Sequence, residues 1–253
     1  MKAGVSSEGG RSREATCQKA ALFGGLVLLG IVHLVAEPGL AATISLTSKP
    51  LTVYRTCTLT ATPNTTTAET DSYVEQASAN SNNGTAATMD VQSRNNANRR
   101  VYVRFDLARC RPSIPSSSTV TNALLRLFVT AIPGVCRTED AFRSAASWTE
   151  TGVTWNNQPF GTSVNNPPSS QRTDAITVGA APCQNSTANV YVSGWSVIPD
   201  VQAFVSGTAT NYGWMIRDDA ENSATTRNAR FSSKEANLLA QSPQLVITYI
   251  ASP

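Results

Sequence analysis

The stretch Ser147–Pro159 reads SWTETGVTWNNQP and carries two of the chain's four tryptophans among hydroxyl and amide side chains. A solvated loop seldom exposes two rings of this size, because each would leave a large apolar area in water. A core strand seldom contains Asn-Asn-Gln-Pro, because buried amides need hydrogen-bond partners and proline cannot donate to a sheet. The stretch therefore predicts a strand that runs into a packed, hydrogen-bonded corner, with Trp148 and Trp155 buried there. The alternative is that both rings form a platform on which sugars stack.

Apolar and polar side chains alternate along Arg99–Leu107. This period of two is typical of a strand that has one face in the core and the other in water. On this prediction Val101, Val103, Phe105 and Leu107 are buried, and the side chains that face water are those of Arg100, Tyr102, Arg104 and Asp106. Replacing both Arg100 and Arg104 is accordingly expected to leave the melting temperature nearly unchanged.

Two further stretches, 123–130 and 245–250, are apolar on both faces, as central strands between packed layers are. Turns rich in proline and serine separate the strands. One short helix is predicted around 197–206, since Pro199 suits a first turn and Gly207 ends the apolar spacing. Many short strands with frequent turns predict an all-β fold, a β-sandwich with jelly-roll topology.

Several segments add a resemblance to this pattern. They are residues 100–107 (RVYVRFDL), 123–127 (ALLRL), 147–159 (SWTETGVTWNNQP), 211–214 (NYGW), 231–235 (FSSKE) and 243–249 (PQLVITY). In this order, over Asp71 to Ile250, they resemble the DNRLRE-type domain, a secreted β-jelly-roll module related to a carbohydrate-binding module family that includes alginate binders. Lys234 stands where that family usually has arginine. The resemblance implies the fold more strongly than it implies a function.

The N-terminus has the layout of a secretory signal. Basic residues precede an apolar run from Ala20 to Ala36, and Pro38 and the small pair Ala41-Ala42 follow it. This order predicts a signal peptide over 1–42 that is removed by cleavage, so that the protein contacts the membrane only during export. The alternative is an uncleaved signal anchor. The remaining chain is predicted to hold an N-terminal strand and loop over 43–70 and the jelly roll over 71–253. The expected location is secreted, extracellular or at the cell surface.

Residue counts exclude several classes of function. The only histidine, His33, lies in the predicted signal peptide, so the mature chain lacks a Ser-His-Asp or Cys-His relay. The net charge of the whole chain is only +3, whereas non-specific nucleic-acid binding needs a strongly basic surface. We therefore expect no nucleic-acid partner and no catalytic residue.

Four cysteines remain after the signal peptide, and an even number in an exported protein predicts two disulfides. The sequence leaves all three pairings open. The cysteines are Cys57, Cys110, Cys136 and Cys183.

Two clusters of oxygen-bearing side chains are candidate calcium sites, since calcium prefers carboxylate and carbonyl oxygens. One combines Asp71 with Asn82, and the other is the pair Asp218 and Asp219. Solvated turns are the alternative for both. No cofactor is required by the predicted function, and a structural calcium is an option.

The predicted partner is a polysaccharide or a cell-surface glycan. Arg100 and Arg104 on one strand face, with Tyr102 between them, would suit the carboxylates and ring of an acidic polysaccharide such as alginate. Trp195 and Trp214, each beside a glycine, are further candidates for ligand contact, although core packing is the simpler interpretation of all four tryptophans.

Three functions remain open at this stage. The first is a secreted, non-catalytic carbohydrate-binding module for an acidic polysaccharide. The second is a structural or adhesive protein of the cell surface or extracellular matrix. The third is a polysaccharide lyase or glycosidase, which the missing histidine disfavours without excluding, because a lyase can use tyrosine and arginine instead.

Overall fold

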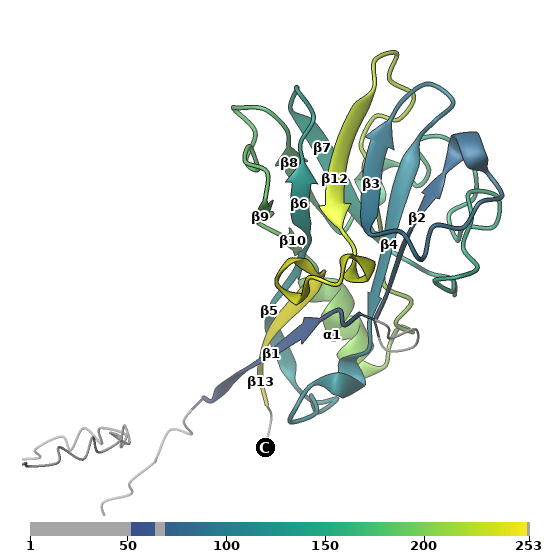
Figure 1. Ribbon diagram of the computed structural model, residues 1–253. Helices are drawn as coiled ribbons and strands as arrows, with labels where there is room; N and C mark the ends of the chain where they lie inside the picture. Colours follow the sequence, from purple (N-terminus) through teal and green to yellow (C-terminus); the bar gives the residue numbers. More distant parts are fainter. Residues whose placement is uncertain (1–51, 64–68, 252–253) are drawn as a thin grey trace, which may run out of the picture. The chain divides into compact units, whose positions relative to one another are not determined.

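The computed structural model describes residues 52–63 and 69–251, so the predicted signal peptide lies outside the described residues. Within this part of the chain the strands form two antiparallel sheets that pack face to face (Figure 1). The smaller sheet has four strands. Their order is β1 (Tyr54–Thr60), β13 (Gln244–Ile250), β5 (Thr119–Arg126) and β10 (Trp195–Ser196).

The larger sheet has nine strands. Their order is β8 (Asp174–Val178), β7 (Arg137–Arg143), β11 (Trp214–Asp218), β4 (Arg99–Phe105), β3 (Thr88–Ser93), β12 (Arg227–Ser232), β6 (Phe128–Ala131) and β9 (Val190–Tyr191), and β2 (Glu69–Glu75) also pairs with β4. The predicted all-β sandwich is confirmed. So is the predicted helix, which is α1 (Ile198–Ser206), with Pro199 in its first turn and Gly207 in the left-handed conformation after it. The short 3-10 turns are η1 (Gln76–Ser78), η2 (Leu107–Arg109), η3 (Ser169–Gln171), η4 (Lys234–Ala236) and η5 (Leu239–Gln241).

The main hydrophobic core lies between the two sheets. Alternate residues of β13 and β4 point into it, as their period of two predicts. They are Leu245, Ile247 and Tyr249 from β13, and Val101, Val103 and Phe105 from β4. Full burial of each such side chain is worth about 1.5–3 kcal/mol, so this layer supplies much of the driving force for folding.

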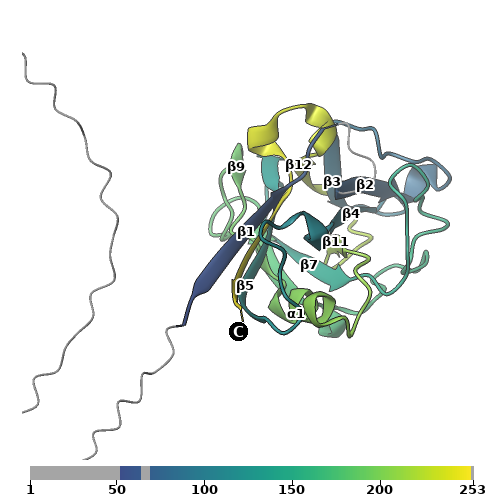
Figure 2. The same ribbon diagram turned by 90° about the horizontal axis from the view of Figure 1, so that it is seen from below.

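A second hydrophobic core covers the opposite face of the large sheet. The connection from β7 to β8, which includes Ser147–Pro159, folds back over this face. Figure 2 shows the sandwich from below, where β5 lies beside β1 and the strands β4, β7 and β11 of the large sheet lie farther away. Side chains of four strands meet those of the connection there. The members are Val74, Tyr102, Phe142 and Met215 from the strands, and Trp148, Val153 and Trp155 from the connection.

This second core corrects the prediction for β4. The face that was expected to meet water is covered at Arg100 and Tyr102, which are fully buried, whereas Arg104 is only partly buried and Asp106 is exposed as predicted. The physical reason is that tryptophan and valine side chains of the connection need an apolar surface, and the outer face of the central strands supplies it.

Two disulfides form, as the cysteine count predicts. Cys57 in β1 pairs with Cys110, with 5.5 Å between their Cα atoms, and Cys136 pairs with Cys183, with 5.3 Å. Such bridges persist in oxidising compartments, which indicates an extracellular setting. In the described ranges we find no helix with the length and apolar character that crossing a membrane requires.

Candidate functional site

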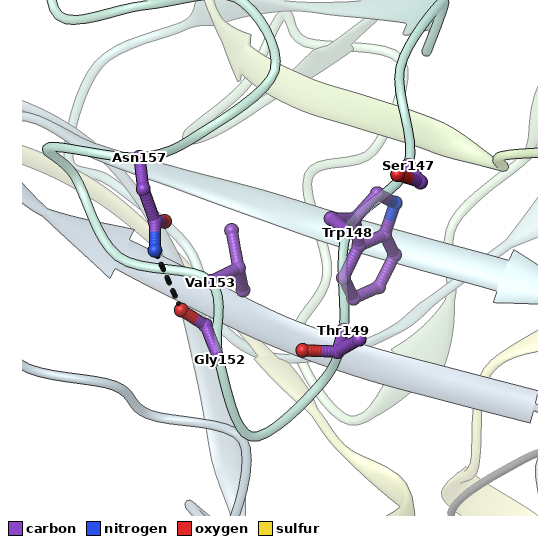
Figure 3. Close-up of a pocket in the computed structure, with 6 residues that line it drawn as sticks. All are labelled: Ser147, Trp148, Thr149, Gly152, Val153 and Asn157. Atoms are coloured by element: carbon purple, nitrogen blue, oxygen red, sulfur yellow. Dashed lines mark hydrogen bonds between the residues drawn. The ribbon is translucent and has the colours of Figure 1, made fainter.

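The corner formed by Ser147–Pro159 borders two adjoining pockets. The first, called pocket A, has a volume of about 260 Å³ (Figure 3). Ser147 and Asn157 contribute polar side chains to it, and the Asn157 amide is fixed because its Nδ2 donates to the carbonyl oxygen of Gly152 over 2.9 Å. The residues that line pocket A are Ser147, Trp148, Thr149, Gly152, Val153 and Asn157.

The second pocket, called pocket B, has a volume of about 350 Å³, and two charged side chains, those of Arg104 and Glu150, line it without forming an ion pair with each other. Thr149 is exposed and lines both pockets, so it stands between them. The residues that line pocket B are Thr70, Arg104, Thr149, Glu150 and Thr151. Hydroxyl groups and a guanidinium at one shallow site are suited to bind a hydroxylated, acidic ligand.

The turn after β2 holds this corner in place. Asn82 donates from its Nδ2 to the carbonyl oxygens of Glu150 and Val153 over 2.7 and 2.8 Å, and its Oδ1 accepts from the backbone N–H of Gly84 over 3.1 Å. A Cβ on Gly84 would lie 2.2 Å from the Glu150 carbonyl oxygen, so only glycine allows this close approach. Asn82 was predicted as a calcium ligand; in this structure the hydrogen bonds of its amide position the corner.

Of the three predicted ligand residues on β4, only Arg104 reaches a pocket. Its guanidinium lies 5.8 Å from the centre of the Trp148 ring, and among the described residues no carboxylate pairs with it. Arg100 and Tyr102 are enclosed beneath the connection. Arg100 forms two hydrogen bonds to Glu221, of 2.7 and 2.8 Å, and the Tyr102 hydroxyl donates to Gln158 over 2.9 Å.

The tryptophans are core residues in this conformation. Trp195 and Trp214 are 0% exposed, and their indole N–H groups donate to the Glu139 carbonyl oxygen and the Asp200 carboxylate, each over 2.8 Å. Trp148 donates to the Tyr212 carbonyl oxygen over 2.7 Å, lines pocket A and is only 6% exposed. None of the four rings therefore presents an open face on which a sugar could stack.

An acidic cluster lies behind pocket B. Asp71 from β2, Glu150 from the corner and Glu235 from η4 each offer a carboxylate oxygen, and these atoms lie within 4.8 Å of one another, an arrangement that could hold a metal ion. Lys234 is buried in the same cluster. Its ammonium pairs with Glu150 and Glu235, and its backbone N–H donates to Asp71 over 3.0 Å.

The charged groups of this cluster shift one another's pKa values. Burial raises the pKa of Asp71 well above its usual value, and the nearby Glu235 raises it further. Burial also raises the pKa of Glu150, against the pull of Lys234. Burial lowers the pKa of Lys234, but its hydrogen bonds to Glu150 and Glu235 outweigh this and the pKa is raised overall. Lys234 is therefore the positive charge that allows the carboxylates to stay buried.

The other predicted calcium ligands have a different environment. Asp218 is buried and accepts from Arg137 over 2.8 Å, and Asp219 lies 3.5 Å from the same guanidinium. The positive charge at this pair is thus supplied by arginine, and neither aspartate belongs to the acidic cluster that contains Asp71.

A comparison with known families identifies the family of most of the described chain. A family model described as carbohydrate-binding module family 96 matches residues 62–249, which include both pockets, the acidic cluster and the strands from β2 to β13 except the last residue of β13. The chain belongs to carbohydrate-binding module family 96. Modules of this kind bind carbohydrate and are typically non-catalytic. A search of the curated proteins finds no match to the chain.

The candidate site contains residues that the sequence patterns did not single out. Thr149 and Thr151 gave no signal beyond their place in the quoted stretch, and Glu235 gave none beyond the FSSKE segment. Lys234 was noticed only as a departure from the resemblance. Its pairing with Glu150 joins residues 84 positions apart, and no local pattern predicts a contact of that range.

Proposed function

We propose that this family 96 protein is a secreted, non-catalytic module that binds an acidic polysaccharide at pockets A and B. Arg104 is the residue that contacts the negative charge of the ligand. The threonine hydroxyls around it supply hydrogen bonds to sugar hydroxyls. The observation that supports this proposal most is the guanidinium of Arg104 at the wall of pocket B, which has no ion-pair partner among residues 52–63 and 69–251.

An acidic ligand is favoured by the charges at the pocket. Glu150 also lines pocket B, but its charge is offset by the ammonium of Lys234 on its buried side. Arg104 has no such partner among the described residues and lies against the Trp148 ring, which limits its motion. A guanidinium held in one place can pair with a carboxylate or sulfate through two parallel hydrogen bonds.

Hydrolysis is disfavoured at this site. A glycosidase needs two carboxyl groups on either side of the scissile bond, and among the residues that line the two pockets Glu150 is the only carboxylate. A lyase that uses tyrosine would need its hydroxyl at the ligand, whereas Tyr102 is buried beneath the connection. The alternative that remains is a structural or adhesive role for the whole sandwich.

No cofactor is part of the proposed function. A calcium ion bound by Asp71, Glu150 and Glu235 would place a dication beside the ammonium of Lys234, and the repulsion of like charges opposes this. Calcium would thus have to displace Lys234 from the cluster.

The proposal predicts retardation in a native gel that contains an acidic polysaccharide. Polyuronate gels should retard the protein, gels with a neutral glucan should not, and raising the salt from about 0.01 to 0.15 M should weaken the retardation, since the Debye length falls from about 30 to 8 Å. Bovine serum albumin serves as the protein that should migrate equally in all gels. No retardation by any carboxylated or sulfated polysaccharide would favour the structural role instead.

A further inference from the structure

The wall of pocket B contains a buried hydroxyl without a partner. Thr70 on β2 lines the pocket and is only 2% exposed. Its Oγ1 atom forms no hydrogen bond with any of the residues that the structure describes. Most buried hydroxyls are hydrogen-bonded, because burial removes the water that would otherwise pair with them. At the wall of a pocket, the missing partner can be supplied by a ligand.

A second unpaired atom belongs to the same pocket. The Oε1 atom of Glu150 pairs with the ammonium of Lys234 and accepts from the backbone N–H of Asp71 over 3.4 Å. The Oε2 atom of Glu150 is buried and has no hydrogen-bond partner within residues 52–63 and 69–251. Because Lys234 holds Oε1, Oε2 is the atom that is left to accept a hydrogen bond from a group in pocket B.

The large sheet holds Thr70 and Arg104 side by side. They are direct partners on the antiparallel strands β2 and β4, so their Cβ atoms lie about 4.5–5.5 Å apart. Both side chains line pocket B, and so does Glu150. A uronate whose carboxylate pairs with Arg104 therefore places a ring hydroxyl, of the same sugar or the next, near Thr70 and Glu150.

The two unpaired groups together match a free hydroxyl. A carboxylate oxygen only accepts hydrogen bonds, whereas a threonine hydroxyl can donate one as well as accept. A sugar hydroxyl can thus donate to Oε2 of Glu150 and accept from the hydroxyl of Thr70 at the same time. An acetyl ester at that position has no hydrogen to donate, and the carboxylate oxygen would stay unpaired.

We propose that Thr70 and Glu150 bind a free ring hydroxyl beside the carboxylate that Arg104 holds, so that the site selects uronate polymers whose ring hydroxyls are not esterified. This inference rests on the proposed function, because it requires the carboxylate to bind at Arg104. It sets no limit on how many rings of the polymer are charged. Arg104 recognises the charge, and Thr70 with Glu150 recognises the hydroxyl.

The test changes the hydroxyls of a polymer without changing its charge. Alginate and polygalacturonate are acetylated on their ring hydroxyls to different extents, and part of each sample is treated with hydroxylamine, which removes the esters and leaves the glycosidic linkages intact. In isothermal titration calorimetry at constant salt, full acetylation should weaken binding to the wild-type protein at least about tenfold, since a hydrogen bond is lost and an acceptor is left unpaired. The de-esterified polymer should regain the affinity of the untreated one.

Variants of Thr70 separate binding from stability. Thr70→Val keeps the shape of the side chain and should weaken binding of the unesterified polymer about 3- to 10-fold, the loss of one neutral hydrogen bond. It should unfold at the same or a higher urea concentration, because the lost hydroxyl has no hydrogen-bond partner among the described residues. Thr70→Ser keeps the hydroxyl and should bind more strongly than Thr70→Val. Thr58→Val makes the same change at an exposed position of β1 in the other sheet and should leave binding unchanged.

Two results would overturn the inference and leave the proposed function intact. One is equal affinity of the wild-type protein for the acetylated and the free polymer, and the other is a folded Thr70→Val protein that binds as tightly as wild type. The polymer series needs no variant, so it decides the inference even where Thr70→Val does not fold. Failure of the wild-type protein to bind any acidic polysaccharide would overturn the proposed function as well.

Discussion

Replacing Arg100 with alanine is expected to lower the free energy of unfolding by about 3–5 kcal/mol, the usual cost of removing one partner of a buried ion pair. The Arg100 and Glu221 side chains are both 0% exposed, and Arg100 also donates to Gln158 and to the carbonyl oxygens of Gly161 and Ser163. Its loss leaves the Glu221 carboxylate buried without a cation. Urea unfolding followed by tryptophan fluorescence measures the difference, and Trp155, whose ring lies 4.6 Å from the Arg100 guanidinium, reports on this region.

Arg104→Ala is the matched control. Arg104 is only partly buried and has no ion-pair partner among the described residues, so its loss should change the free energy of unfolding by no more than about 1 kcal/mol. Adding Glu221→Gln to Arg100→Ala should recover part of the stability, because it removes the uncompensated charge. An Arg100→Ala protein as stable as wild type would show that the connection does not enclose β4.

The second large effect is expected at Lys234. Lys234→Met removes the ammonium that pairs with Glu150 and Glu235 and should cost about 3–5 kcal/mol at pH 7. Protonation should restore part of this stability as the pH falls from 7 toward 5. The sign follows from the pKa values of Asp71 and Glu150, which folding raises; the folded state then binds more protons than the unfolded state over this range, and stability rises as the pH falls.

The control for Lys234 is the conservative replacement. Lys234→Arg keeps the positive charge and should retain more stability than Lys234→Met at pH 7. Calcium should stabilise Lys234→Met more than wild type, because the carboxylates of Asp71, Glu150 and Glu235 are then free to bind it. Equal stability of wild type and Lys234→Met at pH 7, with equal responses to pH and calcium, would contradict the role of Lys234 as the resident cation.

Local sequence patterns predicted most of the fold. The alternation in β4 correctly assigned Val101, Val103 and Phe105 to the core, and proline and glycine placed the short helix within one residue of its ends. The even number of cysteines predicted two disulfides, although only the structure showed that Cys57 pairs with Cys110. These features depend on neighbours in sequence or on simple counts, and so they can be read without knowing the contacts.

The candidate site was less predictable because it depends on contacts between distant segments. Arg100 and Tyr102 alternate with the apolar residues of β4, which is the pattern of side chains that face water. They are buried because the connection from β7 to β8, about 50 residues later in the chain, covers them. The stretch Ser147–Pro159 did indicate a packed corner, but the strand face that it covers could not be inferred from it. For the same reason only Arg104, near the end of β4, remained at a pocket.

The most direct test of the central claim measures the affinity of Arg104 variants by isothermal titration calorimetry. The ligand is the acidic polysaccharide that retards the wild-type protein most strongly in the gel. Loss of a charge-assisted hydrogen bond is worth about 1.5–3 kcal/mol, so Arg104→Ala should bind about 10- to 100-fold more weakly while unfolding at the same urea concentration, and Arg104→Lys should lie between. A folded Arg104→Ala protein that binds with the affinity of wild type would contradict the assignment of pocket B as the site that binds the acidic sugar.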